Sequence, residues 1–317
     1  MPDLDAVLKQ HAAKSDIDAD VARAVSGLAK AAATISRLIR TADKAVNLGA
    51  IKGSANADGD DQKALDVLAD DVITAQLCDA GVAIYLSEEQ DAPIPLNDEG
   101  TLIVASDPLD GSSNIDTNVS IGTIFSIMPA AGGALQSGRN QLAAGFFVYG
   151  PQTTLLVTLG DGVLAFQMDD DGCFCDMGWQ VVMPSDTHEF GINASNQRHW
   201  HAPVKAYIDD CLDGRDGALK QNYNMRWVGS LVADAWRIFR RGGVFLYPAD
   251  RRDGYAKGRL RLVYEANPVA MLVEQAGGKA TDGTNSILDI EPKDLHERVP
   301  FIFGSMNEVD VIVGYHS

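Results

Sequence analysis

The sequence predicts an α/β protein of two lobes, and three observations predict it. The chain has 317 residues, 46% of them hydrophobic, which at roughly 100 to 200 residues per domain is enough for two lobes in one compact unit. Segments with the apolar spacing of helices alternate with short apolar runs of strand length. The middle of the chain consists instead of successive β-type segments. We expect an N-terminal lobe of residues 1–183 and a C-terminal lobe of residues 184–317.

The net charge of the chain excludes some classes of partner. It is −18 at pH 7, with a pI near 4.6, whereas nucleic acids and acidic membrane surfaces are bound by clustered Lys and Arg. An anionic ligand would need metal ions or a local basic pocket. The four cysteines are too few for a disulfide scaffold. From the charge we expect no nucleic-acid or membrane partner. We also expect a cytoplasmic protein, because no segment resembles a signal peptide or a membrane span.

The first quarter of the chain predicts two helices with a loop between them. One set of apolar residues recurs on a single helical face over residues 16–40, and Ser15 is placed to cap this helix. Residues 49–60 are rich in Gly, Ala, Ser, Asn and Asp and predict a mobile loop. A second apolar set predicts a helix that ends near Gly81. The two sets are Val21, Val25, Leu28, Ile35, Leu38 and Ile39, and Leu65, Leu68, Val72 and Leu77.

After these two helices the sequence predicts strands, and acidic residues come directly after the first two of them. Residues 82–86 and 102–105 are apolar runs of strand length, each ending in acidic residues. From 122 to 167 four β-type segments separated by turn residues predict an antiparallel meander.

In the last third of the chain, segments with helical spacing alternate again with segments of strand length. This pattern predicts helices at about 204–212 and 230–241 and a strand at 243–247. A further strand at 259–265 would run into a helix that is capped by Asn267, has Pro268 at its first position and ends at Gly277 and Gly278. Glu265 would therefore lie at a strand-to-helix junction.

These strand ends gather carboxylates. Buried carboxylates are costly unless they are paired or bind a cation, and Mg²⁺ prefers hard oxygen ligands. In DPLDGSS, residues 107–113, a proline is expected to fix a turn between two acids, and Gly111, Ser112 and Ser113 would offer backbone N–H groups to a phosphate. Alone, this run is equally consistent with a structural turn. The candidate ligands are Glu88, Glu89, Asp107, Asp110 and Glu265.

Four segments together resemble class 1 fructose-1,6-bisphosphatase, over a region from about Ala32 to the C-terminus. They are SEE at 87–89, DPLDGSSNID at 107–116, RWVGS at 226–230 and YEANP at 264–268. The DPLDGS core is shared with the wider inositol monophosphatase-like superfamily, so alone it indicates only metal-dependent phosphatase chemistry. The segments RWVGS and YEANP restrict the resemblance to fructose-1,6-bisphosphatase.

The resemblance implies an αβαβα sandwich whose two lobes meet at a Mg²⁺ site, with Mn²⁺ as a substitute ion. Asp66 and Glu89 would orient and deprotonate the water that attacks the phosphorus atom of fructose 1,6-bisphosphate. The implied ligands are the carboxylates of Glu88, Asp107, Asp110 and Glu265, the carbonyl of Leu109, and Asp60 from the mobile loop.

The resemblance also implies a distal phosphate site and a homotetramer, in which Arg226 reaches a neighbouring subunit. The residues implied to hold the second phosphate and the sugar are Asn193, Arg226, Tyr247, Arg259 and Arg261. Asn196, Trp227 and Leu231 depart from the animal pattern, as does Arg259, which replaces a lysine. Sedoheptulose-1,7-bisphosphatase or bifunctional activity therefore stays open, as does a non-catalytic homologue. The residues that bind AMP in the animal enzymes are also replaced, so we do not expect AMP inhibition at that site.

Overall fold

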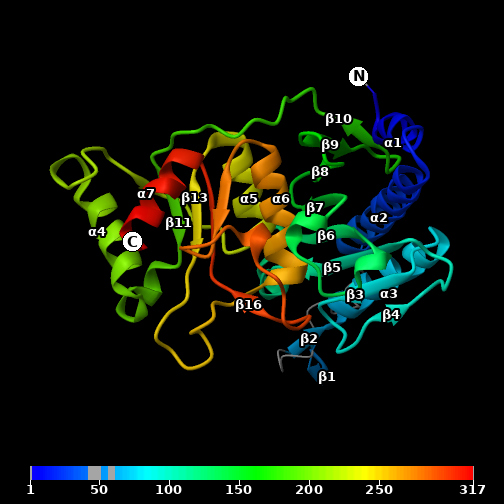
Figure 1. Ribbon diagram of the computed structural model, residues 1–317, viewed down its shortest axis with the longest axis horizontal. Coiled ribbons are helices and arrows are strands. Elements are labelled where there is room, and N and C mark those ends of the chain that lie inside the picture. The colour runs from blue at the N-terminus through cyan, green and yellow to red at the C-terminus, as the bar shows by residue number, and fades with distance from the viewer. Residues whose placement is uncertain (1, 42–50, 56–60, 317) are drawn as a thin grey trace.

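The computed structural model describes residues 2–41, 51–55 and 61–316 and has five layers, helix, sheet, helix, sheet, helix (Figure 1). Helices α1 (Leu4–Ala12), α2 (Asp16–Thr41) and α3 (Ala64–Asp79) cover one face of an eight-stranded sheet. Helices α5 (Leu231–Arg241) and α6 (Asn267–Gln275) lie between this sheet and a five-stranded one, and α4 (Ala202–Asp213) and α7 (Met306–His316) cover the far face. The predicted αβαβα sandwich is confirmed.

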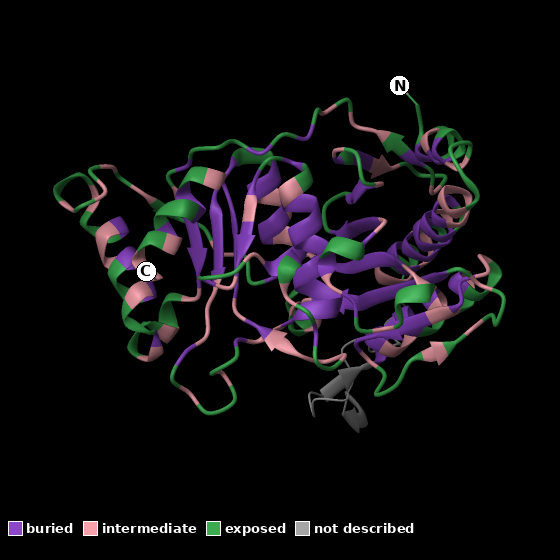
Figure 2. Cartoon of the chain, viewed as in Figure 1, coloured by how far each residue is buried: buried purple, intermediate pink, exposed green. Residues whose placement is uncertain are grey.

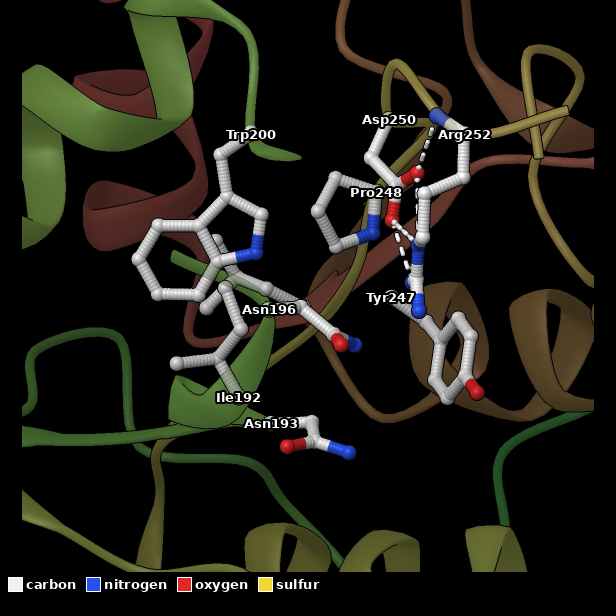
Figure 3. A pocket seen from close by; sticks show the side chains of 9 residues that line it. Ile192, Asn193, Asn196, Trp200, Tyr247, Pro248, Asp250 and Arg252 are labelled. Atoms are coloured by element: carbon white, nitrogen blue, oxygen red, sulfur yellow. Dashed lines mark hydrogen bonds and ion pairs between the residues drawn. The ribbon is translucent and has the colours of Figure 1, made fainter. Parts of the chain in front are cut away.

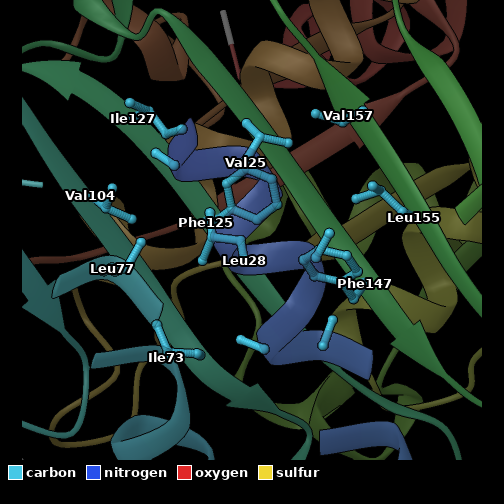
Figure 4. Close-up of a cluster of buried hydrophobic side chains, with 14 of the residues drawn as sticks. Val25, Leu28, Ile73, Leu77, Val104, Phe125, Ile127, Phe147, Leu155 and Val157 are labelled. Atoms are coloured by element: carbon cyan, nitrogen blue, oxygen red, sulfur yellow. The ribbon is translucent and has the colours of Figure 1, made fainter. Parts of the chain in front are cut away.

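The outer helical layer packs on the large sheet through apolar side chains. Ser15 Oγ accepts a hydrogen bond from the Asp18 N–H at 3.2 Å, so the predicted cap of α2 is present. From α2, Val25 and Leu28 meet Phe125 and Phe147 of the sheet in a cluster of buried side chains (Figure 4). Burying such side chains contributes about 1.5–3 kcal/mol each. This cluster fixes α2 and α3 against the strands that carry the acidic residues.

The eight-stranded sheet has the order β10-β9-β8-β7-β6-β5-β3-β4. Strands β6 to β10 pair antiparallel with their chain neighbours, so the predicted meander is confirmed, whereas β3 and β5 are parallel. The strands are β3 (Ile84–Ser87), β4 (Ile94–Pro95), β5 (Leu102–Asp110), β6 (Ile121–Pro129), β7 (Ala143–Tyr149), β8 (Thr153–Thr158), β9 (Leu164–Met168) and β10 (Phe174–Asp176).

The turn expected at residues 107–110 is wrong. Strand β5 continues to Asp110, and its pairing with β6 is irregular between Asp107 and Asp110. Such a bulge bends the strand and re-aims side chains while most of the ladder is kept. It is this bulge that sets the directions of the two carboxylates.

Central helix α6 is buried over most of its length because sheets cover it on both faces. Seven consecutive residues of α6, Asn267–Val273, are buried, which fits a helix between two sheets rather than an amphipathic surface helix. The strand expected at 259–265 is wrong beyond Arg261. Strand β14 (Leu260–Arg261) is followed by a π-helical turn, η6 (Leu262–Ala266), that runs directly into α6.

The expected N-cap at Asn267 is therefore also wrong, because the chain is already helical at Ala266. Pro268 does lie at the start of α6, where its missing N–H costs nothing.

The second sheet has the order β12-β11-β13-β17-β15. Its outer face packs against α4 and α7 through a separate apolar cluster that includes Tyr207, Val244 and Ile302. The strands are β11 (Glu189–Ile192), β12 (Asn224–Met225), β13 (Val244–Tyr247), β15 (Lys279–Thr281) and β17 (Phe301–Gly304), and β14 pairs separately with β16 (Arg298–Val299).

The loop expected at 49–60 contains a strand. β1 (Ile51–Ala55) pairs antiparallel with β2 (Asp61–Lys63) immediately before α3. Asp60, the ligand that the resemblance assigns to this loop, lies outside the described residues.

Buried residues are concentrated in the two sheets and the central helices (Figure 2). Across the described part of the chain, no helix has both the length and the apolar composition needed to cross a membrane.

Candidate active site

Three buried carboxylates from distant parts of the chain converge at one point. Glu88, Asp107 and Glu265 each offer an oxygen, and these oxygens all lie within 4.8 Å of one another. Glu88 directly follows β3, and Asp107 lies in the neighbouring parallel strand β5, so the two strands deliver their acids to the same edge. Glu265 comes from the π-helical turn before α6. The wider turn of a π-helix displaces side chains relative to a regular α-helix, and such turns are frequent at functional sites.

The electrostatics of this acidic cluster disfavour three negative charges. Burial, and then the charge of Glu265, raise the pKa of Glu88 well above its ordinary value. Burial and then Glu88 do the same to the pKa of Asp107. Burial raises the pKa of Glu265 to about 7, although Arg261 opposes the shift. The cluster therefore favours whatever brings positive charge.

One positive charge is already present, because Arg261 Nη1 lies 2.8 Å from Glu88 Oε1 and both side chains are buried. The backbone N–H of Arg261 also donates to Glu265 Oε2 at 2.6 Å. The resemblance assigns Arg261 to the second phosphate and the sugar. The structure shows it in contact with the acidic cluster, a contact that the sequence did not reveal.

Asp110 joins the site from the far side of the β5 bulge. Its Oδ2 accepts hydrogen bonds from Ser230 Oγ at 3.2 Å and from the Val232 N–H at 3.0 Å. Burial raises its pKa to about 6 even though these hydrogen bonds favour the charged form. The second lobe therefore supplies the hydrogen-bond donors to this carboxylate.

The phosphate-binding turn expected after Asp110 has suitable backbone geometry. Gly111 has a φ of 78° and precedes a 3₁₀-helix, η1 (Ser112–Thr117). A left-handed residue followed by a helical turn directs successive N–H groups outward, and the first N–H groups of a helix have no internal acceptor. Gly111 and Ser112 are half-buried and Ser113 is exposed.

The two residues assigned to water activation lie on elements next to the acidic cluster's strands. Asp66 is buried in the first turn of α3, which packs on β3 and β5. Glu89 is half-buried, follows Glu88 directly, and its charge contributes to raising the pKa of both Glu88 and Asp107.

A small pocket lies at the end of β13 (Figure 3). Asn193 and Tyr247, both predicted, line it, together with Asn196 and Trp200. Burial raises the pKa of Tyr247, and Arg259 opposes the shift, so Arg259 lies near this tyrosine.

Arg259 is held by contacts that the sequence interpretation missed. Its Nη1 donates to Tyr255 Oη at 2.9 Å, and its guanidinium lies 4.8 Å from the centre of the Tyr255 ring. Arg252 lies over the same ring at 3.9 Å and is paired with Asp250. The tyrosine thus separates two guanidinium groups near the pocket.

Arg226 lies apart from this pocket within the chain. Its side chain is exposed, and its backbone N–H donates to Phe190 O at 2.7 Å. The neighbouring Trp227 is stacked on Phe245, with ring centres 5.3 Å apart. Buried Asp234 accepts hydrogen bonds from the Val228 and Gly229 N–H groups and so fixes this turn.

The acidic cluster fits a divalent metal ion. Its donors are hard carboxylate oxygens, which suit Mg²⁺ and Mn²⁺. Glu88 Oε2 is buried and has no hydrogen-bond partner within the described residues, which is costly unless a cation binds it. Leu109 lies within the bulge between Asp107 and Asp110, where its N–H donates to Asp107 Oδ1 at 2.9 Å.

Known proteins are similar to this chain in both sequence and fold. Family models described as the N-terminal and C-terminal domains of fructose-1-6-bisphosphatase match residues 5–178 and 183–317. Class 1 fructose-1,6-bisphosphatase of Azorhizobium caulinodans is 52% identical, with 99% of this chain and 98% of the relative covered. The Rhizobium meliloti protein is 50% identical, with 99% and 93% covered. A crystal structure of Leishmania major fructose-1,6-bisphosphatase in holo form has a TM-score of 0.92 and 33% identity, with 99% and 98% covered.

Proposed function

The chain belongs to the class 1 fructose-1,6-bisphosphatase family, and from this premise we propose that its acidic cluster carries the hydrolysis of fructose 1,6-bisphosphate to fructose 6-phosphate and phosphate. The protein is accordingly a phosphoric monoester hydrolase. The observation that carries the assignment of the site is the convergence of Glu88, Asp107 and Glu265 beside Asp110 and the Gly111 turn. The intact acidic set argues against a non-catalytic homologue.

The proposed ligands of the ions are Glu88, Asp107, Asp110 and Glu265, with the Leu109 carbonyl and Asp60 completing the set, and the proposed ion is Mg²⁺, replaceable by Mn²⁺. Divalent ions held there would neutralise the phosphoryl oxygens and make the attacking water more acidic. Arg261 supplies positive charge next to Glu88 without occupying Glu88 Oε2. Its position supports a role at the metal end of the substrate.

Glu89 and Asp66 are the proposed base and orienting group for the attacking water. Glu89 would accept the proton from the water oxygen, because it lies next to Glu88 but is only half-buried and can exchange its proton with solvent. Asp66 would align the water from α3. The N–H groups of Gly111, Ser112 and Ser113 would hold the phosphoryl oxygens in line with it.

The distal phosphate would bind in the pocket of Asn193 and Tyr247, with Arg259 as its counter-charge. Arg226 is exposed and does not line this pocket, which supports its placement in the site of a neighbouring subunit of a homotetramer. The matched ranges 5–178 and 183–317 support a division close to the proposed boundary at residue 183. The four cysteines are free thiols, which suits a reducing cytoplasm.

Phosphate release from fructose 1,6-bisphosphate, measured after chelation and again after adding Mg²⁺, tests this function. Release should require Mg²⁺ and should be abolished in Asp107→Asn, whereas Asp98→Asn, an exposed acid outside the site, should leave it unchanged. Parallel assays with sedoheptulose 1,7-bisphosphate measure the sugar preference. Metal-independent release, or equal activity of wild type and Asp107→Asn, would exclude the proposed site.

A further inference from the structure

Behind the acidic cluster lies a second buried network, centred on Asp70, that the reaction does not directly use. Asp70 belongs to α3, one helical turn after Asp66, and only 4% of it is exposed. Its Oδ1 accepts hydrogen bonds from Ser87 Oγ at 2.7 Å and from Tyr85 Oη at 3.0 Å. Its Oδ2 accepts one from Gln90 Nε2 at 2.8 Å. A single carboxylate thus ties the helix of Asp66 to the strand and turn of Glu88 and Glu89.

The network continues into β5. Tyr85 Oη also lies 2.8 Å from Ser106 Oγ. Because a tyrosine hydroxyl has one hydrogen and Tyr85 gives it to Asp70, Ser106 is the donor in this second contact. Burial and then the charge of Asp70 raise the pKa of Tyr85 well above its ordinary value, so its hydroxyl stays protonated.

Two direct contacts of Asp70, and a third that runs through Tyr85, end next to proposed site residues. Ser87 directly precedes Glu88, Gln90 directly follows Glu89, and Ser106 directly precedes Asp107. Ser87 Oγ, besides donating to Asp70, accepts a hydrogen bond from the backbone N–H of Glu89 at 3.2 Å. The position of the Glu89 backbone is therefore linked through one hydroxyl to the Asp70 carboxylate.

A turn held at both ends cannot shift one of its acids without breaking a hydrogen bond to the buried Asp70 carboxylate. Breaking one would leave a buried polar group unsatisfied, which structures strongly disfavour. Catalytic geometry must be held within about 0.5 Å, and partners one step removed from a metal ligand commonly provide that constraint.

We propose that Asp70 is a positioning residue that fixes the Glu88–Glu89 turn relative to Asp66 and Asp107, through its hydrogen bonds to Ser87, Gln90 and Tyr85. This inference rests on the roles proposed above for Glu88 and Glu89. Asp70 itself touches neither substrate nor metal. Its loss should therefore weaken metal binding and turnover while substrate binding at the distal pocket persists.

The test uses Asp70→Ala and Ser87→Ala in the full chain, with Asp71→Ala as the matched control. Asp71 is an exposed acid on the same helix, so the control makes the same chemical change without the network. Mn²⁺ binding is measured by titration of the chelator-treated protein, and kcat and KM are measured with saturating Mg²⁺. In both network variants the Kd for Mn²⁺ should rise and kcat should fall by about 10- to 100-fold, while KM changes less than about threefold. Ser87→Thr, which keeps the hydroxyl, should recover most of both losses.

A purely structural role predicts a different result. If the melting temperature falls but the Mn²⁺ Kd and kcat of the folded protein match those of Asp71→Ala, the positioning role is overturned. Failure of the proposed function gives a different result. If the wild-type chain releases no phosphate but its Mn²⁺ affinity still depends on Asp70, the proposed hydrolysis is wrong and the positioning role is supported.

Discussion

The Asp110 carboxylate, at the end of β5, accepts a hydrogen bond from the backbone N–H of Val232, in the first turn of α5, at 3.0 Å. An acid of the large sheet therefore caps a helix of the C-terminal half of the chain. An N-terminal helix end favours a negative charge, and yet burial raises the pKa of this acid to about 6. The same carboxylate serves the contact between the two halves and the candidate metal site.

Asp110→Asn separates these two roles. An asparagine oxygen can still accept from Val232, so the contact is kept while the charge is lost. We expect the activity to fall by at least about 100-fold and the melting temperature of the metal-free protein at pH 8 to stay equal or to rise, because a buried charge has been removed. Thermal melts with chelator and phosphate-release assays check this, with Asp98→Asn as the exposed control. A large drop in melting temperature would show that the negative charge stabilises the start of α5 by more than its burial costs.

The pH dependence of metal binding follows from the raised pKa values. Metal ligands must be deprotonated, and burial raises the pKa of Glu265 to about 7 and of Asp110 to about 6. The Mg²⁺ concentration for half-maximal activity should therefore fall as the pH rises from about 6 to about 8. A half-saturating concentration that is constant over this range would contradict the expectation.

The folding stability of the metal-free protein should fall as the pH rises, whereas metal binding strengthens. A carboxyl whose folded pKa is raised loses its proton more easily when unfolded, so folding stability falls as the pH rises from the unfolded value near 4 through the folded value. Melting temperatures measured with chelator should be lower at pH 8 than at pH 5.5, and added Mg²⁺ should raise them more at pH 8.

Arg261→Gln should destabilise the metal-free protein. The Arg261 guanidinium pairs with buried Glu88 at 2.8 Å, and removing one partner of a buried pair costs about 3–5 kcal/mol. Because Glu88 can escape this cost by taking a proton, the loss should be smaller at low pH. Urea unfolding at pH 5.5 and pH 8 measures it. Lys279→Gln, which breaks an exposed pair with Asp310, should cost less than about 1 kcal/mol.

The Asp250–Arg252 pair should be lost only in acid. Hydrogen bonds from Arg252 hold the pKa of Asp250 below its ordinary value. The stability that this pair contributes is therefore complete above the unfolded carboxyl pKa, near 4, and disappears as the pH falls through the lower folded value. Asp250→Asn should melt at a lower temperature than wild type at pH 7, and the two should converge below about pH 3. Asp209→Asn, at an exposed pair with Lys205, is the control.

The helices and the meander could be predicted from sequence because each depends on a local pattern. The spacing of apolar residues in α2 and α3, and the turn residues between β6 and β9, produce a clear period within one segment. The π-helical turn at Glu265 has no such period. A strand-like run, LRLVYEA, becomes helical there while it packs on β5 and β6 of the large sheet, which is tertiary context overriding local propensity.

The sequence alone determined the chemistry of the site, because the residue types that can hold a divalent ion and their order in DPLDGSS, SEE and YEANP are properties of the chain. Only the tertiary structure decided which of these acids meet, which cation neutralises them and what holds them in place. Arg261 contacts Glu88 across 173 positions of sequence, Asp110 caps a helix that begins 121 residues later, and Asp70 reaches both ends of the Glu88–Glu89 turn. Each of these contacts forms because a buried polar group must find its partner wherever packing brings one within hydrogen-bond distance, and that distance is not encoded in any local pattern.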